Sequence, residues 1–316
     1  MQPTTSFPSA TTTRALSFAE MQDHIQRALN DKITGQIRAV FHRDVTITLF
    51  AQQGKLRQVY LRNHRVPNTD WKYSISVYGD GALNIEPLPA RALLFKKVIL
   101  ETLSPVSPKI VKTNQIHSIF QTIEQDTNPT LFHIKWQNAE GYVVTAGKSI
   151  SLRYAVMRSP VGASEGQFAL DQFPIWDEPQ CQVTTYHGDI KNQAWLEVHL
   201  NILFEWYCAR VLRYYEQLTG SVMLQSILRR VYILAIDEGW SIETQRKSLS
   251  DATLFPSAGI AGRTYKRIIS LIEKQIEPII GSALAQKILE QAYNDIPKGI
   301  YKTIAEAFEI TENLSS

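Results

Sequence analysis

The sequence predicts an α+β protein: two tandem small sheet-plus-helix modules followed by an all-helical C-terminal bundle. Alternating apolar residues, typical of half-buried strands, occur in the first two thirds, whereas apolar spacings of three and four dominate the last third. The order of helix-like and strand-like stretches in the first module also recurs in the second, at an offset of roughly 95 to 100 residues. We therefore divide the 316 residues into a flexible N-terminus at 1–13, a first α+β module at 14–108, a second α+β module at 109–212 that is either a degenerate repeat or an unrelated domain, and a helical domain at 213–316.

The first module is predicted to open and close with helices around a sheet. Apolar residues share one helical face over 16–29, and a second helix-like stretch covers 90–103 before a proline-containing linker at 104–108. Between them, alternating residues and a glycine turn at 52–55 predict a hairpin. The predicted strands are 36–41, 45–50, 56–61, 73–78 and 82–85.

The second module repeats this order. A helix-like stretch at 115–123 leads to a strand at 131–136, a hairpin about a second glycine turn at 146–148, and a further strand at 181–186. The hairpin strands are predicted at 141–145 and 149–157. A long apolar helix at 195–212, with aromatic residues at helical spacing, is expected to form a core seam.

The third segment contains almost no alternating stretch. Helical periodicity occurs at 221–237, 261–276, 282–293 and 301–310, and glycines and prolines separate these runs. The one long connection is 251–262, which is uncharged after Asp251. Loops of this size are often functional or mobile, so we expect it to contribute to partner binding.

Composition excludes several protein classes. Although 44% of the residues are hydrophobic, no run of about 18 apolar residues predicts a membrane span, and residues 1–13 do not form a signal peptide. Two cysteines are too few for a disulfide framework or a four-cysteine zinc site, so we expect a protein of the reducing cytoplasm. The seven histidines include no pair at the i, i+4 spacing of a metal site, and none lies beyond His199. We therefore predict no metal, no cofactor and no enzymatic activity.

Three residues remain as candidates for a nucleophile or a ligand. Cys181 and Cys208 lie in apolar surroundings, which favours buried core side chains over reactive thiols. His187 precedes Gly188 and Asp189 in a predicted turn, where a solvated loop is the favoured interpretation over a ligand role.

The net charge of +3 hides an asymmetry. The net charge is +6 over residues 1–110, −3 over residues 111–199 and zero over residues 200–316. Around the first hairpin, cations occur beside Tyr60 and His64. Such a surface binds an acidic protein partner, binds nucleic acid, or is merely solvated. The residues assigned to this predicted basic face are Arg38, Arg43, Lys55, Arg57, Arg62 and Arg65.

A second candidate site lies before the predicted helix at 261–276. Gly259 and Gly262 precede a helix with cations in its first turns, an arrangement that can hold an anion at a helix N-terminus. An ordinary loop and helix start is the alternative. The candidate cations are Arg263, Lys266 and Arg267.

The first module resembles the PATAN domain, the N-terminal module of cyanobacterial response regulators of the PatA type. The resemblance rests on residues 32–37 (KITGQI), 47–50 (ITLF), 53–56 (QGKL), 59–61 (VYL) and the closing helix 95–103. It covers about a third of the chain, or two thirds if the second module is a degenerate copy. The resemblance implies a non-catalytic interaction module in pilus, motility or cell-patterning pathways. This chain departs from the family because a helical domain stands in place of a receiver domain.

Together these observations predict a cytoplasmic, non-enzymatic regulatory adaptor that acts by binding a protein partner with an acidic surface. No membrane insertion is expected, and a homo-oligomer is compatible with the sequence. The alternative is a nucleic-acid-binding transcriptional regulator that uses the same basic face.

Overall fold

The computed structural model describes residues 10–11, 15–102, 105–123, 128–146, 154–159, 162–245 and 247–309, which form two compact units. The first unit comprises Met1–Ile123, Thr130–Val144 and Tyr154–His187 and contains two six-stranded sheets. The second comprises the remaining residues, which include the C-terminal helices. The predicted α+β class is thus confirmed. No helix within the described ranges is both long enough and apolar enough to cross a lipid bilayer.

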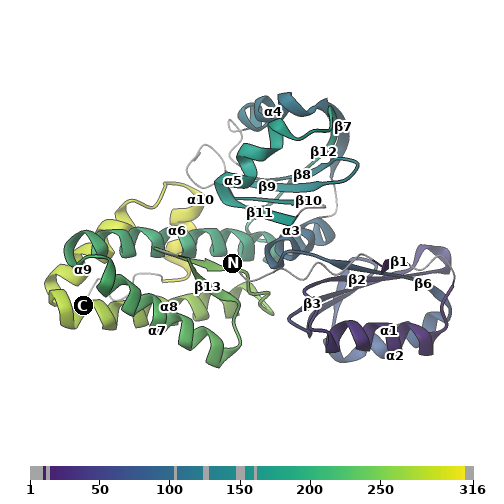
Figure 1. The fold of residues 1–316 in the computed structure, drawn as a ribbon, viewed down its shortest axis with the longest axis horizontal. Helices are drawn as coiled ribbons and strands as arrows, with labels where there is room; N and C mark the ends of the chain where they lie inside the picture. Colours follow the sequence, from purple (N-terminus) through teal and green to yellow (C-terminus); the bar gives the residue numbers. More distant parts are fainter. Residues whose placement is uncertain are drawn as a thin grey trace. The chain divides into compact units, whose positions relative to one another are not determined.

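The first sheet has the strand order β1-β6-β2-β3-β4-β5, with every pairing antiparallel. Helices α1 (Phe18–Asn30) and α2 (Trp71–Tyr78) lie along one of its faces (Figure 1). Met21 and Ile25 from α1 are buried there in one apolar core with Ile37 and Leu49. The strands are β1 (Ala10–Thr11), β2 (Gly35–Phe41), β3 (Thr46–Gln52), β4 (Lys55–Leu61), β5 (His64–Val66) and β6 (Gly81–Pro87).

Local signals account for the elements that the sequence predicted correctly. Ser17 begins α1 with a capping box, in which its hydroxyl accepts the Glu20 N–H and the Glu20 carboxylate accepts the Ser17 N–H. The turn between β3 and β4 places Gln53 at φ 52° and Gly54 at φ 75°. A Cβ on Gly54 would lie 2.3 Å from the carbonyl oxygen of Leu29, so only glycine fits this turn.

Two expectations for the first module were wrong or incomplete. The alternating stretch at 73–78 forms the helix α2 instead of a strand, because Trp71 and Ile75, four residues apart, are both buried in the core. Tyr73 and Val77, which complete the alternation, are exposed. At the N-terminus, Ala10 and Thr11 pair with β6 as the strand β1, whereas the rest of 1–13 lies outside the described residues.

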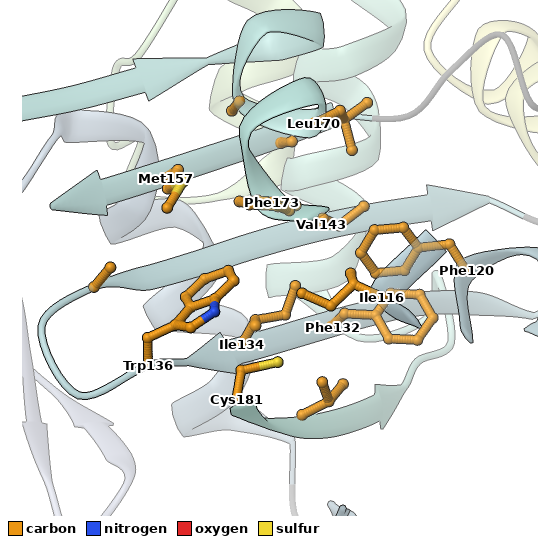
Figure 2. Close-up of a cluster of buried hydrophobic side chains, with 14 residues drawn as sticks. Ile116, Phe120, Phe132, Ile134, Trp136, Val143, Met157, Leu170, Phe173 and Cys181 are labelled. Atoms are coloured by element: carbon orange, nitrogen blue, oxygen red, sulfur yellow. The ribbon is translucent and has the colours of Figure 1, made fainter. Parts of the chain in front are cut away.

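The second sheet has the order β11-β10-β9-β8-β12-β7. Its apolar core joins the sheet to helices α4 (Ile116–Ile123) and α5 (Gly166–Gln172) through Phe120 of α4, which packs on Phe132 of the sheet, and through Leu170 of α5 (Figure 2). The strands are β7 (Val106–Lys112), β8 (Pro129–Lys135), β9 (Glu140–Ala146), β10 (Tyr154–Ser159), β11 (Gly162–Glu165) and β12 (Gln180–His187). The predicted turn residues 147–148 and the strand residues 149–153 lie outside the described ranges.

The predicted linker at 104–108 is partly a strand. Residues Val106–Lys112 form β7, which among the described strands pairs only with β12 and therefore lies at the edge of the sheet. Pro108 is tolerated there because an edge strand leaves one side of its backbone unpaired, and the pairing shifts in register between Val183 and Thr185, opposite the proline. The prolines of the predicted linker therefore lie at the edge strand of the second sheet as well as at the end of the first module.

The two sheets share one topology. Each has the chain order strand, helix, four strands, helix, strand and helix, and in each the first strand pairs with the last one, which in turn pairs with the second strand. Helix α3 (Ala90–Glu101) closes the first set, and α6 (Gln193–Thr219) follows the second. Such matching order over six strands is what an internal duplication predicts.

Helix α3 is buried almost all around and joins the two sheets of the first unit. The Tyr60 hydroxyl of β4 donates to Glu101 at 2.8 Å, and the Phe95 ring lies 5.8 Å from the ring of Tyr142 on β9. Two of its charged side chains, Arg91 and Lys97, are also buried. A helix that is buried on most sides is typical of a position inside a protein, which explains why this stretch is mostly apolar apart from Arg91, Lys96, Lys97 and Glu101.

In the second unit, α6 contacts α7, α8, α9 and α10, and its aromatic stripe is buried as predicted (Figure 1). The helices are α7 (Ser221–Glu238), α8 (Ala258–Ile280), α9 (Ser282–Asn294) and α10 (Ile300–Ala307). Helix α8 continues past Pro278 to Ile280, although Pro278 has no backbone N–H to donate to the carbonyl four residues earlier. Helix α6 is a single element of this unit, so the predicted boundary at 212 falls inside it.

The segment predicted as a long loop, 251–262, is shorter than expected and largely buried. Asp251 ends a hairpin of strands β13 (Ile242–Gln245) and β14 (Ser248–Asp251), and α8 already begins at Ala258. Polar residues spaced by four along α6 hold the connection: Glu205 accepts the Asp251 N–H at 2.5 Å, Asn201 donates to the Asp251 carbonyl at 3.0 Å, and Glu197 accepts the Phe255 N–H at 3.2 Å. Thr253, Leu254 and Phe255 are buried, so their side chains do not offer a docking loop.

Candidate functional site

A polar groove of about 470 Å³ lies within the first unit. One wall is the face of the first sheet opposite α1 and α2, where two cross-strand pairs, Gln36 with Glu86 and Arg38 with Asn84, lie side by side on β2 and β6. The other wall comes from the second sheet, and Lys96 of α3 lies between them. The lining residues from the second sheet are Lys135, Trp136, Gln137, Asn138, Ala139, Glu140, Arg158 and Ser159.

A chain of alternating charges crosses the groove. The Lys96 ammonium lies 3.1 Å from the Glu86 carboxylate and 3.5 Å from the Glu140 carboxylate, and Arg158 also pairs with Glu86. The Lys96 side chain is only 16% exposed, so these contacts are poorly screened by solvent. The chain links β6, α3, β9 and β10 and therefore fixes the width of the groove.

Glu140 carries its charge in a partly buried environment. Burial alone would raise the pKa of this carboxyl, but the hydrogen bond with His133 Nε2 at 2.5 Å and the Lys96 charge hold that pKa well below its usual range. Burial lowers the pKa of His133, whose ring stacks on Tyr142 at 4.9 Å. The pair is therefore an ionised carboxylate that accepts a hydrogen bond from a neutral imidazole.

The groove retains unused binding capacity. Arg38 and Lys135 are exposed, and within the described ranges neither is paired with a carboxylate. The buried amide oxygens Gln36 Oε1 and Asn84 Oδ1 also have no hydrogen-bond partner there. A buried acceptor without a donor costs roughly 1 to 3 kcal/mol, and a ligand that donates hydrogen bonds relieves this cost once the two amide side chains turn toward the groove.

The turn at Gln137 and Asn138 forms part of the second wall and is fixed by hydrogen bonds to other parts of the chain. Glu178 accepts hydrogen bonds from the backbone N–H groups of Gln137 and Asn138, and these bonds lower the pKa of its carboxyl. The Trp136 indole N–H donates to the Thr113 hydroxyl at 3.2 Å. The wall is therefore preorganised, which reduces the ordering cost of binding a ligand.

The structure does not bring the six predicted basic residues onto one face. Arg38 and Arg65 lie in one cross-strand row, through Thr48 and Tyr60, so about three strand spacings or 14 Å separate them. Arg43 and Arg62 occupy left-handed turn positions at one end of the sheet. Lys55 follows the turn at the opposite end, and Arg57 lies at a bulge, where burial lowers the pKa of its guanidinium. Only Arg38 lines the groove.

The aromatic residue of the predicted nucleic-acid face is not available for stacking. Tyr60 is fully buried, and its hydroxyl donates to Glu101 and lies 3.0 Å from Gln58 Oε1. Single-stranded nucleic acid is commonly bound by exposed aromatic rings beside cations. The hairpin strand thus lacks one of the two features that suggested this interpretation.

The predicted anion site forms the first turns of α8. Ser257 caps this helix by accepting the Ile260 N–H, and a Cβ on Gly262 would lie 2.1 Å from the Phe308 ring, so this glycine serves close packing. Lys266 pairs with Glu309 at 2.9 Å, and Arg267 pairs with Glu238 at 2.7 Å. A Cβ on Gly259 would make only ordinary contacts, at 3.8 Å to Arg263 and 3.9 Å to Ser257, and Arg263 is exposed at the same end of the helix. Two of the three predicted cations are therefore already neutralised by carboxylates.

The two cysteines are placed as the sequence indicated, whereas His187 is the last residue of a strand and not part of a turn. Cys181 and Cys208 are buried, and burial raises the pKa of the Cys181 thiol to about 11 and that of Cys208 further. His187 is exposed at the end of β12, where its Nδ1 lies 3.3 Å from the Thr130 hydroxyl. In the described part of the chain, no three His, Cys, Asp or Glu side chains gather into a cluster that could hold a metal ion.

Most residues of the groove were not predicted. Glu86, Glu140 and His133 are scattered in the sequence, and their proximity depends on how the two sheets meet at α3. One signal was present: Lys96 and Lys97 lie within a mostly apolar helix. A lysine in such a helix requires buried carboxylate partners, which the sequence alone could have indicated.

Comparisons with known proteins do not assign the chain to a family. No family model matches it, and no curated protein matches it. Among solved structures it is similar to a putative DNA polymerase III beta subunit from Eubacterium rectale ATCC 33656 (6% identity, TM-score 0.11) and to the beta subunit from DNA polymerase of Streptococcus pyogenes (8% identity, TM-score 0.10). The alignments cover 57% and 58% of this chain but 65% and 68% of those chains. Similarity at this level identifies neither fold nor activity, and the resemblance to PATAN domains stays a prediction.

Proposed function

We propose that this chain is a non-enzymatic regulatory adaptor whose groove binds an acidic segment of a partner protein. The observation that carries the proposal is the combination of two exposed cations, Arg38 and Lys135, with the buried amide oxygens of Gln36 and Asn84. Carboxylates of an acidic segment pair with the cations, and the N–H groups of its backbone or amide side chains donate to the two oxygens. The lining residues carry four cations and two carboxylates, so their net charge favours an acidic ligand.

The same chemistry makes nucleic acid the less favoured ligand. A phosphodiester backbone accepts hydrogen bonds but donates none, so it leaves the two amide oxygens unsatisfied. Tyr60 is also too buried to stack on a base.

The resemblance of the first module to PATAN domains extends the proposal to a type of pathway. The adaptor would act in the cytoplasm, in a signalling pathway of the pilus, motility or cell-patterning type. Its output is the binding of a partner, since the chain has a helical domain where the family has a receiver domain.

The test compares two double variants of the full chain in capture experiments from lysate of the native cell. Arg38→Ala with Lys135→Ala removes both groove cations, whereas Arg43→Ala with Lys55→Ala removes two exposed cations outside the groove. We expect the groove variant to lose roughly 90% of the captured protein and the control to keep it, because opposite charges across an interface contribute specificity. The proposal fails if both variants lose the partner equally, or if nuclease treatment releases everything that is captured.

A further inference from the structure

Helix α7 of the second unit is apolar on two opposite faces. Its inward face buries Leu224, Ile227, Leu228, Val231 and Ala235. On the outward face Val222 is 81% exposed, Ile236 58% and Ile233 48%. Single exposed apolar residues are ordinary, but several on one helical face are typical of an interaction surface.

The exposed residues form a seam. Positions 222, 226, 229, 233 and 236 alternate in spacing between four and three, which is the heptad spacing of a helix that packs against another helix. Met223 and Tyr232, also exposed, lie on either side and widen the apolar strip. At the centre of the seam is Arg229, which has no carboxylate partner within the described residues.

The position of this arginine disfavours a second copy of the chain paired over the full length of the seam. Residue 229 is the middle of the five seam positions, so a symmetric antiparallel pair of α7 helices places Arg229 against its own copy. A parallel pair does the same, because equal seam positions face each other. Arg230, one residue on, adds a further like charge. Both arrangements therefore juxtapose cations in an apolar interface, which is unfavourable.

A lipid surface fits the seam less well than a helix does. Helices that lie on membranes keep their cations on the polar face, beside the apolar face, where the cations reach the headgroups. Arg229 instead interrupts the apolar face itself, between Val222 and Ile233. Position 226 of the seam is Ser226, so Arg229 is its one charged residue, and a charged residue inside a seam selects one helical partner and one register.

We propose that the outward face of α7 binds an amphipathic helix of a partner protein, with a carboxylate side chain of that helix opposite Arg229. Apolar side chains of the partner cover Val222, Ile233 and Ile236, and the ion pair at the centre fixes the register. This site lies in the second unit and uses none of the groove residues, so it is independent of the proposed function of the groove.

The test uses a pair of synthetic 18-residue helical peptides as probes, binding to the full chain being measured by fluorescence anisotropy. Both peptides carry leucine at the outer seam positions, and the central seam position is Glu in one and Lys in the other. We expect the wild-type chain to bind the Glu peptide at least about tenfold more tightly than the Lys peptide. Arg229→Glu should invert that preference, whereas the control Arg213→Glu, an exposed arginine on α6, should not change it.

Several results would overturn the proposal. These are the absence of binding to either peptide, an equal affinity for both, or a preference that Arg229→Glu does not invert. Binding to vesicles of phosphatidylcholine and phosphatidylserine that Ile233→Ser abolishes would show a lipid site instead. Self-association in sedimentation equilibrium that Ile233→Ser abolishes would show that a second copy covers the face.

Discussion

His199 makes the stability of the second unit depend on pH in a window that can be calculated. Its side chain is fully buried on α6, its ring stacks on Trp195, and its Nδ1 lies 3.1 Å from the Tyr301 hydroxyl. Burial lowers the pKa of His199 to about 3, whereas an unfolded histidine titrates near 6.5. The unfolded chain therefore binds a proton between these two values and the folded chain does not.

The sign and the size of the effect follow from proton linkage. Since the unfolded state binds more protons, the free energy of unfolding is highest above pH 6.5 and falls as the pH drops toward 3. The slope is about 1.4 kcal/mol per pH unit, so lowering the pH from 7 to 5 removes about 2 kcal/mol. In His199→Gln the side chain cannot titrate, and an amide can still bond to the Tyr301 hydroxyl.

The assay is native-state hydrogen exchange by mass spectrometry, followed in peptides from Gln193–Thr219 between pH 5 and 7. We expect the opening free energy of these peptides in the wild-type chain to fall by about 2 kcal/mol over this range, after correction for intrinsic exchange. His199→Gln should remove most of this fall. The control His64→Gln changes an exposed histidine in the other unit and should leave it unchanged. An equal fall in His199→Gln and wild type would refute the reasoning.

Three further predictions concern packing, the charge chain and the thiols. Gly262→Ala places a Cβ 2.1 Å from a ring atom and should lower the free energy of unfolding by about 1 to 3 kcal/mol. Gly259→Ala, with no atom closer than 3.8 Å, should raise the free energy of unfolding by about 0.5 kcal/mol. Urea titrations measure both changes, and equal stability of the two variants and the wild type would contradict this prediction. Lys96→Met leaves two partly buried carboxylates without this cation and should lower the opening free energy of β9 by about 2 to 3 kcal/mol. Hydrogen exchange of β9 measures this change, and unchanged protection of its amides would contradict the prediction. Cys181 and Cys208, whose thiols have raised pKa values, should react with Ellman's reagent at pH 8 only after unfolding in urea, and reaction of the native chain would contradict their burial.

Much of the secondary structure could be predicted because local signals agree with tertiary packing. The capping residue Ser17, the turn at Gly54 and the 3.6-residue periodicity of α6 to α9 each mark an element without reference to the rest of the chain. Prediction failed where packing chose between two local options. The stretch 73–78 alternates like a strand, yet Trp71 and Ile75 bury one helical face. The buried hairpin before α8 was missed because its backbone is held by α6, which lies far from it in the sequence.

The groove could not be predicted for a different reason. Its walls come from strands of two sheets, so the distance between Glu86 and Arg158 in the sequence carries no information about their contact in space. The basic residues that composition singled out are scattered by the period of the strands and by the turns that carry Arg43 and Arg62. Charge totals indicated which module is basic, and only register showed that Arg38 shares a wall with Gln36, Asn84 and Glu86.

Site-specific photocrosslinking in the native cell tests the central claim most directly. A photoreactive side chain at Lys135 samples the groove, and the same side chain at Lys55 samples an exposed position outside it. We predict that the probe at position 135 crosslinks to a protein segment rich in Asp and Glu, that Arg38→Ala strongly reduces this product, and that the probe at position 55 does not form it. A crosslink to nucleic acid, or the same protein product from both positions, would contradict the claim that the groove binds an acidic segment.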